Sequence, residues 1–151
     1  MAFPYKTILC PLDFDDNSLM TLDRAVEIAR HFDSRLILLY VLPLVISPGD
    51  IPPLAGMYEE QEKAARAKLD DIAKQKLSGL KHELLVYVGD VIECILNVQK
   101  KHRSDLVVMA THGRRGLARM FVGSVAEAIV RKATCPVLTI REDTPENSYR
   151  S

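Results

Sequence analysis

Residues 109–125 read MATHGRRGLARMFVGSV, and they directly continue an apolar run that starts at Leu106. Glycines stand at positions 113, 116 and 123, between this run and a helical pattern that follows. A strand that ends in a glycine-rich loop and passes into a helix can hold phosphate, because free backbone N–H groups and the positive end of the helix dipole meet there. The stretch therefore predicts an anion-binding turn, and a nucleotide site would need further walls elsewhere in the chain.

The rest of the chain alternates short apolar runs with amphipathic stretches. RLILLYVL at residues 35–42 is apolar after its first residue, as expected for a strand covered on both faces, and Pro43 ends it. Residues 43–56 contain four prolines and two glycines and predict an irregular loop. The hydrophobic periodicity predicts strands at 6–12 (with Pro11 closing it), 35–42, 82–88, 104–109 and 135–140, and helices at 18–31, 57–77, 91–101 and 124–133.

The alternation of strands and helices defines the fold class. Helical crossovers between strands imply an α/β fold with a doubly wound, five-stranded parallel sheet and helices on both faces. We expect one domain over residues 1–141 and a polar C-terminal tail over 142–151. Ligands of such sheets bind beyond the carboxyl ends of the strands, where the strand order reverses. Polar residues follow two strands there, at Asp13 and from Thr111 to Gly116, and they are neighbours if the fourth strand lies beside the first.

Several of these polar residues also have a purely structural interpretation. Residues 13–18, DFDDNS, gather side chains that cap free N–H groups at the start of the first helix. Asp90 is in position to cap the third helix, and Ser124 and Glu127 have the spacing of a capping box. Asp13 and Ser124 can therefore act as helix-starting residues as well as ligand-binding ones.

Composition and charge exclude several classes of protein. Twenty Lys and Arg balance twenty Asp and Glu, so no net positive charge favours nucleic acid or an anionic membrane. No apolar run approaches the roughly 20 residues of a membrane span, and the N-terminus MAFPYKTILC lacks the layout of a signal peptide. Cys10, Cys94 and Cys135 have no CxxC spacing, so we expect reduced thiols, no metal site and a cytoplasmic location.

Several segments together resemble the universal stress protein family. They are ILCPLD at 8–13, LLYV at 38–41, the GD at 89–90, DLVVMATHGRRG at 105–116 and GSVAEAIVRKATCPVLTI at 123–140. Each is weak alone, but the combination is specific and covers residues 5–141. The resemblance implies a Rossmann-like, doubly wound α/β domain that is usually homodimeric. The family divides into members that bind ATP and members that do not.

ATP-binding members share a loop pattern of glycine, two residues, glycine, nine residues, glycine, and then serine or threonine. Aligned from its far end, the pattern falls on Gly113 and on Gly123-Ser124, and its first glycine falls on Ala110. If position 110 needs only a small side chain, alanine is tolerated. If it needs a positive φ, alanine would cost about 1 kcal/mol or more.

The resemblance also implies roles for single residues. Asp13 would bind the ribose hydroxyls, the backbone of Val41 the adenine edge, and the N–H of Val125 a phosphate. Arg114, with its neighbours at 115 and 119, could add positive charge or could be solvated surface. The complete set implied for ATP, with Mg²⁺ carried by the nucleotide, is Pro11, Leu12, Asp13, Val41, Met109, Ala110, His112, Gly113, Arg114, Gly116, Gly123, Ser124 and Val125.

Motifs of known catalysts are missing from the chain. There is no GxxxxGK[ST], no strict GxGxxG, and no serine, histidine and acid set in a context that suggests a nucleophile. We therefore expect no catalytic residues and at most a weak ATPase. The expected function is an ATP-binding universal stress protein that acts as a nucleotide-dependent sensor or switch in stress response. The alternatives are a homodimeric interaction module that binds no nucleotide, with Ala110 as the sign of lost binding, and a binder of AMP or cyclic AMP.

The fifth predicted strand suggests how the chain assembles. Its sequence CPVLTI is apolar, and it is expected at the edge of the sheet. An exposed apolar edge is an aggregation hazard unless another chain covers it. We therefore expect a homodimer through about Pro136–Ile140, with an unidentified protein as a further partner and neither nucleic acid nor membrane among the ligands.

Overall fold

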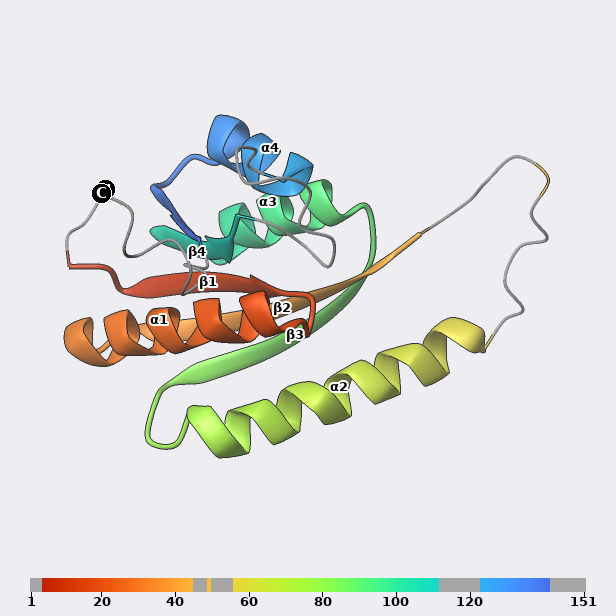
Figure 1. Ribbon diagram of the computed structural model, residues 1–151, viewed down its shortest axis with the longest axis horizontal. Helices are drawn as coiled ribbons and strands as arrows, with labels where there is room; N and C mark the ends of the chain where they lie inside the picture. Colours follow the sequence, from red (N-terminus) through yellow and green to blue (C-terminus); the bar gives the residue numbers. More distant parts are fainter. Residues whose placement is uncertain (1–3, 45–48, 50–55, 112–122, 142–151) are drawn as a thin grey trace, which may run out of the picture.

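Five parallel strands form one sheet in the computed structural model, which describes residues 4–44, 49, 56–111 and 123–141. The strand order is β3-β2-β1-β4-β5, so the fourth strand lies beside the first, as the predicted site requires (Figure 1). The predicted fold class is confirmed. In chain order, the elements are β1 (Thr7–Leu12), α1 (Asp16–Phe32), β2 (Arg35–Pro43), α2 (Met57–Lys76), β3 (His82–Gly89), α3 (Val91–Lys101), β4 (Leu106–Ala110), α4 (Ser124–Lys132) and β5 (Val137–Ile140).

Successive side chains of the strands enter two hydrophobic cores, one on each face of the sheet. On one face, Ile8 of β1 packs with Leu22 of α1 and Leu69 of α2, and all three are fully buried. On the other face, the core contains Ile95 of α3 and Ile129 of α4. Helices α1 and α2 therefore cover one face and α3 and α4 the other, which is why the central strands are apolar along their whole length.

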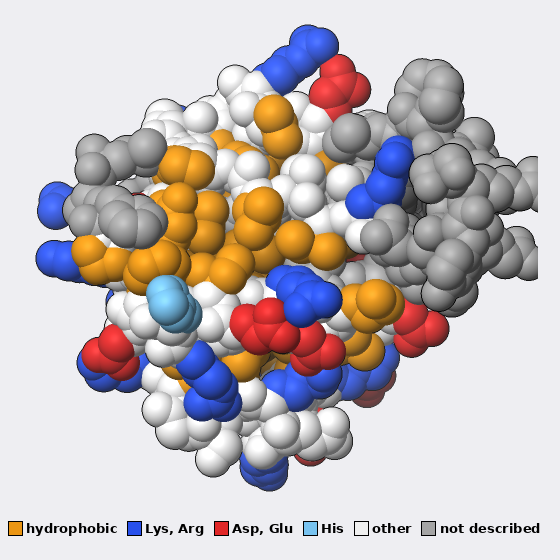
Figure 2. Space-filling view, turned by 60° about the vertical axis from the view of Figure 1, so that its left-hand side comes forward, with side chains coloured by type: hydrophobic (Ala, Val, Ile, Leu, Met, Phe, Trp, Pro, Cys, Tyr) orange, Lys and Arg blue, Asp and Glu red, His pale blue; other side chains and the backbone are white. Residues whose placement is uncertain are grey.

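The edge strands of the sheet are β3 and β5. In β5, Val137 packs against the core between the sheet and helices α3 and α4, whereas Leu138 is 39% exposed. Figure 2 shows hydrophobic side chains gathered on the side of the molecule that lies to the left in Figure 1, where β5 is drawn. This edge therefore offers both unpaired backbone and apolar side chains.

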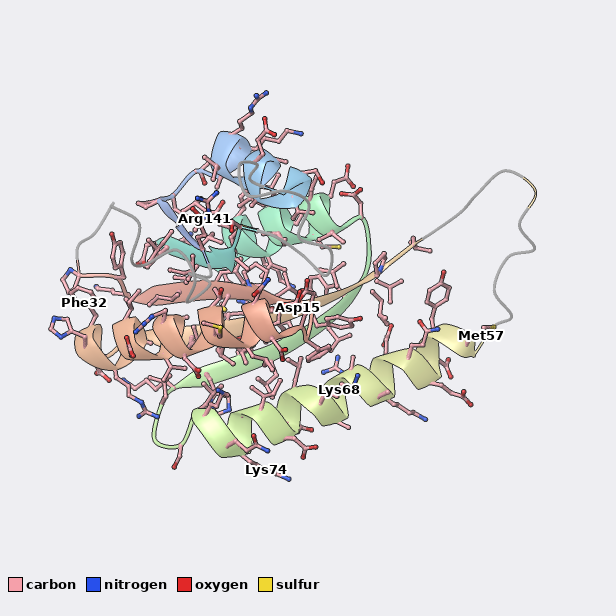
Figure 3. All side chains as sticks on the ribbon, in the orientation of Figure 1. Asp15, Phe32, Met57, Lys68, Lys74 and Arg141 are labelled. Carbon is pink, nitrogen blue, oxygen red and sulfur yellow. The ribbon has the colours of Figure 1, made fainter. Side chains whose placement is uncertain are left out.

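Helices α1 and α3 begin with aspartate caps. Asp15 is the N-cap of α1, and its Oδ1 accepts the N–H of Ser18 at 2.8 Å (Figure 3). The helix thus begins two positions before the predicted residue 18. Asp90 caps α3, as predicted, by accepting the N–H of Glu93 at 2.9 Å. Both helices therefore have a side-chain acceptor for their first N–H groups.

The predicted capping box of α4 is wrong. The N-cap is Gly123, whose carbonyl accepts the N–H of Glu127 at 2.9 Å, and Ser124 is already the first helical residue. Ser124 is therefore one position too late to act as the cap. The reason is tertiary: the N–H of Gly123 donates to the carbonyl of Thr111 at 2.6 Å, and this bond fixes where the helix can begin.

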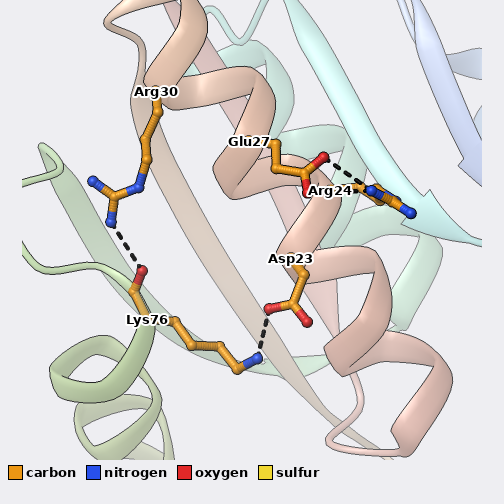
Figure 4. Close-up of polar contacts among 5 residues, drawn as sticks. All are labelled: Asp23, Arg24, Glu27, Arg30 and Lys76. Atoms are coloured by element: carbon orange, nitrogen blue, oxygen red, sulfur yellow. Dashed lines mark hydrogen bonds and ion pairs between the residues drawn. The ribbon is translucent and has the colours of Figure 1, made fainter.

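Polar contacts join the exposed sides of α1 and α2. Arg30 of α1 donates from Nη2 to the carbonyls of Lys76 and Ser78, at 3.3 and 3.1 Å, and so satisfies carbonyls at the end of α2 (Figure 4). The ammonium of Lys76 also pairs with Asp23 of α1 at 2.5 Å. These contacts hold the end of α2 against α1.

Replacing Arg30 with alanine is expected to lower the free energy of unfolding by about 1 kcal/mol, because it removes charge-assisted hydrogen bonds to the carbonyl of Lys76, the last residue of α2, and to that of Ser78 just beyond it. Urea denaturation followed by circular dichroism measures the change. Arg24→Ala is the matched control, because Arg24 lies on the same helix and its contact among the described residues is an exposed ion pair with Glu27, 3.0 Å away. Such pairs contribute little, so the control should change stability by less than about 0.5 kcal/mol. If the two variants lowered the free energy of unfolding equally, the hydrogen bonds of Arg30 to Lys76 and Ser78 would not be what stabilises the fold.

A partly buried histidine lies at the amino-terminal ends of β2 and β3. The Nδ1 of His102 is 3.8 Å from the carboxylate of Glu83, and this carboxylate is already paired with the guanidinium of Arg35. Burial lowers the pKa of His102 below its ordinary value of 6.5, and the positive charges of Arg35 and Lys101 lower it further. His102 is therefore neutral in the folded protein at neutral pH.

The lowered pKa of His102 makes stability depend on pH. Below about pH 6.5, the unfolded chain binds a proton at this histidine that the folded chain resists, so the free energy of unfolding should fall as the pH falls through the pKa of the folded state. Urea midpoints between pH 7.5 and 5 measure the slope. The His102→Asn variant should show a shallower slope over this range. The same slope in both proteins would mean that other groups cause the loss.

Candidate functional site

Strands β1 and β4 meet where the strand order reverses, and their hydrogen-bonded pairing ends before either strand does. Their pairing stops at Leu9↔Val107, whereas β1 continues to Leu12 and β4 to Ala110. Over the same residues, β1 stays paired with β2. We call the unpaired ends of these two strands the β1–β4 fork, formed by residues 10–12 and 108–110. It lies at the carboxyl edge of the sheet, at the position where parallel sheets bind ligands.

Asp13 follows β1 directly and forms one side of the fork. Its N–H donates to Oγ of Ser18 at 2.9 Å, and its Oδ1 accepts the N–H of Asp15 at 3.2 Å. Asp13 is therefore not the helix cap, because Asp15 has that position, but it supports the cap through this bond. Its partly exposed carboxylate is held at the carboxyl edge of β1, where it can accept hydrogen bonds from ligand hydroxyls.

Phe14 is a supporting residue that the sequence analysis missed. It has a φ of 66°, which is unusual for a bulky side chain, and its ring packs on Tyr40 of β2 with centroids 4.5 Å apart. The ammonium of Lys68 on α2 lies 5.3 Å from the ring centroid of Phe14. These contacts hold a strained backbone between Asp13 and Asp15, so they orient both carboxylates. The positive φ depends on contacts distant in sequence, and no local motif signals it.

Pro11 and Leu12 belong to the fork, and Val41 lies near the end of the neighbouring strand β2. The prediction that Pro11 closes the first strand is wrong, because β1 runs on to Leu12, which pairs with Tyr40. Leu12 is 6% and Val41 7% exposed, and they pack into the cores on opposite faces of the sheet. Val41 lies one residue beyond the last residue of β2 that pairs with β1. What these positions offer a ligand is therefore backbone groups, and Pro11 has only its carbonyl to offer.

The end of β4 and the start of α4 form the other side of the fork. Thr111 donates its N–H to the carbonyl of Ile140 at 3.1 Å and accepts the N–H of Gly123 at 2.6 Å, so the start of α4 is held next to the end of β4. No side-chain cap bonds the start of α4 within the described residues. The N–H groups of Ser124 and Val125 precede that of Glu127, which donates to the carbonyl of Gly123, so they have no acceptor within the helix and point out of it at its positive end. This arrangement suits an anion.

The strand position of Ala110 decides between the two alternatives for the first motif position. Ala110 is the last residue of β4 and pairs with Ile140 of β5, so its backbone is extended. It is not among the described non-glycine residues with positive φ. The methyl group therefore imposes no backbone strain. Its neighbour Met109 is 5% exposed and belongs to the core between the sheet and helices α3 and α4, so its side chain faces away from any ligand.

Part of the predicted site lies outside the described residues. These positions are His112, Gly113, Arg114 and Gly116, together with the arginines at 115 and 119. The structure brings the remaining predicted residues together at the carboxyl ends of β1, β2 and β4 and at the start of α4.

Three further features of the described residues bear on the chemistry of the site. Over residues 4–44, 49, 56–111 and 123–141, no group of three or more His, Cys, Asp or Glu could hold a metal ion. In the same part of the chain, no helix is long and apolar enough to span a membrane. Cys10 belongs to the fork, but it is fully buried, and burial raises the pKa of its thiol to about 12, so it is no nucleophile.

Comparison with known proteins identifies the family. The model of the Universal stress protein family matches residues 4–141. The universal stress protein MJ0531 of Methanocaldococcus jannaschii is 33% identical over 147 residues, which cover 94% of this chain and 85% of the relative. The universal stress protein MJ0577 of the same organism is 30% identical over 158 residues, covering 93% of this chain and 98% of the relative.

Solved structures share the fold. Universal stress protein UspA from Lactobacillus plantarum superposes with a TM-score of 0.75 at 28% identity and covers 91% of this chain and 98% of its own. A universal stress protein in complex with cAMP has a TM-score of 0.69 at 23% identity, covering 90% and 97% of the two chains. A universal stress protein from Archaeoglobus fulgidus in complex with dAMP has a TM-score of 0.63 at 21% identity, covering 90% and 98%.

Proposed function

Because this chain belongs to the universal stress protein family, we propose that it binds an adenine nucleotide, foremost ATP, at the β1–β4 fork and acts in the cytoplasm as a nucleotide-dependent sensor or switch in stress response. The observation that carries the proposal is the fork itself. The pairing of the two central strands ends at the switch point, with the carboxylate of Asp13 on one side and, on the other, the start of α4, which has no side-chain cap among the described residues. A ribose needs acceptors for its hydroxyls and a phosphate needs free N–H donors, and the two sides supply one each.

The nucleotide is expected to lie across the fork, from β2 to α4. The adenine edge would meet the backbone of Val41, and the ribose hydroxyls would meet Asp13. The phosphates would meet the N–H groups of Ser124 and Val125 and the glycines of the motif, at 113 and 123. The extended backbone of Ala110 supports this assignment, since alanine at the first motif position costs no strain. Mg²⁺ would arrive with the phosphates, because the described residues contain no ion site of their own.

The related structures in complex with cAMP and dAMP support an adenine nucleotide as the ligand class. Both of those ligands have a single phosphate, so AMP and cyclic AMP are the competing ligands for this chain. We favour ATP because the start of α4 and the glycine motif provide more phosphate-binding groups than one phosphate needs. Hydrolysis should be slow at most, since the fork presents no described histidine or activated thiol.

Isothermal titration calorimetry of the purified protein with ATP and Mg²⁺, AMP and cyclic AMP tests the proposal. The expected result is saturable binding, tightest for ATP. Native mass spectrometry of freshly purified protein should also show retained nucleotide. A folded protein that binds none of the three at millimolar concentration would refute nucleotide binding. It would leave the homodimeric interaction module as the function.

That second function has its own support in the edge strand β5. Leu138 is 39% exposed on this edge, and Val130 of the neighbouring α4 is 53% exposed. Apolar side chains beside unpaired strand backbone fit a two-fold contact between copies of the chain, which would also cover the exposed edge. We propose that β5 is the centre of a homodimer interface.

A charged residue at position 138 tests the dimer. Leu138→Lys is expected to convert the dimer to a monomer, because each two-fold contact then places a lysine from both copies in an apolar interface. Sedimentation velocity measures the mass. Met57→Lys is the matched control, because Met57 is 50% exposed at the start of α2 and far from β5 in the sheet order. A Leu138→Lys protein that remains dimeric would show that the interface lies elsewhere.

A further inference from the structure

Phe14 stands at a backbone position that aromatic residues rarely occupy. Its φ of 66° places it in the left-handed region, where the side chain of an L-residue crowds its own backbone. Glycine or asparagine normally fills such a position, because both adopt this conformation at lower cost. A strained residue persists only where the surrounding structure holds it, and such residues cluster at functional sites. Phe14 directly follows Asp13, the residue expected to bind the ribose.

The ring of Phe14 makes the contacts that offset this strain. It packs on the ring of Tyr40, with centroids 4.5 Å apart and ring planes inclined by 38°. The ammonium of Lys68 on α2 lies 5.3 Å from the centroid of the Phe14 ring, within the range of a cation–π contact. Both aromatic rings also pack against the core between the sheet and helices α1 and α2. The ring thus connects the turn after β1 to β2 and to α2.

Asp13 is held on both sides by this arrangement. The residue before it, Leu12, pairs with Tyr40 in the sheet. The residue after it, Phe14, packs on the ring of the same Tyr40. Between these two contacts, the Oδ1 of Asp13 accepts the N–H of Asp15 at 3.2 Å. The backbone of Asp13 therefore has little freedom to turn, so the direction of its carboxylate is set before a ligand arrives.

We propose that Phe14 is a positioning residue that gives the site its preference for a ribose with both hydroxyls. It acts through Asp13, because a carboxylate that is already oriented loses little conformational freedom when it accepts hydrogen bonds from the ribose. Without the ring, Asp13 would have to be ordered on binding, and the advantage of ribose over deoxyribose would shrink. The proposal rests on the proposed function for its ligand, whereas the ordering of Asp13 by the ring is measured without one.

Three variants of the full chain separate the ring from the backbone. Phe14→Ala removes the ring and keeps the strain, Phe14→Gly removes both, and Phe14→Tyr keeps the ring. Calorimetry with ATP and Mg²⁺ should show binding weakened by about five- to tenfold in the alanine and glycine variants and within about twofold of wild type in the tyrosine variant. The preference for ATP over 2′-deoxy- and 3′-deoxy-ATP should fall in the same two variants.

Phe32→Ala is the matched control for the loss of a ring. Phe32 lies at the other end of α1, is also half-buried, and packs on Tyr5 with centroids 5.6 Å apart. This variant should keep the affinity for ATP and the preference for ribose, because its ring does not contact the turn that holds Asp13. An equal loss in Phe32→Ala would show that any missing aromatic contact weakens the site, and it would overturn the proposal.

A double-mutant cycle shows whether Phe14 acts through Asp13. In the Asp13→Ala protein, adding Phe14→Ala should change the affinity for ATP by less than about twofold, because the residue that it positions is already gone. A further loss of the full size would overturn the proposal, since the ring would then affect binding by another route.

Amide hydrogen exchange by NMR measures the ordering of Asp13 without a ligand. The N–H of Asp13 bonds to Ser18 and that of Asp15 to the carboxylate of Asp13, so both should exchange at least about fivefold faster in Phe14→Ala than in the wild type or Phe14→Tyr. Unchanged exchange in Phe14→Ala would overturn the proposal, and so would wild-type ATP binding in Phe14→Gly. If the wild type binds no nucleotide, the proposed function fails, and the exchange rates alone then decide whether the ring orders Asp13.

Discussion

Replacing Gly123 with valine should abolish ATP binding, with a loss of more than about 100-fold, and should leave the fold intact. Gly123 has φ −57° and ψ 153°, a conformation that valine adopts without strain. Its N–H bond to Thr111 is also retained, because it belongs to the backbone. The branched side chain would stand beside the N–H groups of Ser124 and Val125, in the space that the phosphates need. A 100-fold loss corresponds to about 2.7 kcal/mol of binding free energy.

Calorimetry with ATP and Mg²⁺ measures the loss, and urea denaturation shows that the variant is folded. Gly123→Ala should give an intermediate loss, because one methyl group blocks less of the space. Lys132→Val, at the exposed far end of α4, is the control for valine in the same helix and should bind normally. Wild-type affinity in the Gly123→Val protein would show that the phosphates do not lie at the start of α4.

Removing the carboxylate of Asp13 is expected to have the second-largest effect. Asp13→Ala should weaken ATP binding by about tenfold to 100-fold, because hydrogen bonds to a charged acceptor contribute about 1.5–3 kcal/mol. The fold should survive, since Asp15 and not Asp13 caps α1. Asp16→Ala is the matched control, because Asp16 lies in the first turn of the same helix and removes an equal charge. A similar loss in both variants would indicate a general charge effect.

A double-mutant cycle with deoxy analogues tests the contact to the ribose directly. The wild type should bind 2′-deoxy- or 3′-deoxy-ATP more weakly than ATP, whereas the Asp13→Ala protein should bind all of them alike. Asp13→Asn keeps an acceptor for the N–H of Asp15 and should fall between the two proteins. If Asp13→Ala still distinguishes ATP from both deoxy analogues, the ribose is read by another group.

Most of the fold could be predicted from hydrophobic pattern because burial determines it. The run RLILLYVL predicts a strand covered on both faces, and the structure has β2 over Arg35–Pro43. Asp90 could be predicted as a cap because its acceptor and the helix it starts are adjacent in sequence. In these cases, the interactions that decide the structure lie within a few residues.

The errors concern features that distant residues decide. The start of α4 depends on a bond between Gly123 and Thr111, so the local capping pattern of Ser124 was overridden. The positive φ of Phe14 depends on its packing with Tyr40 and Lys68.

The burial of Cys10 has a consequence for oxidative stress. With a pKa raised to about 12, only about one in 100,000 of these thiols is a thiolate at pH 7, and the thiolate is the form that peroxides oxidise. The side chain is also fully enclosed in the core, so an oxidant would reach it only after the sheet has opened. Peroxide therefore cannot act on the folded protein through this cysteine, and Cys10 would be oxidised only in molecules that have already unfolded.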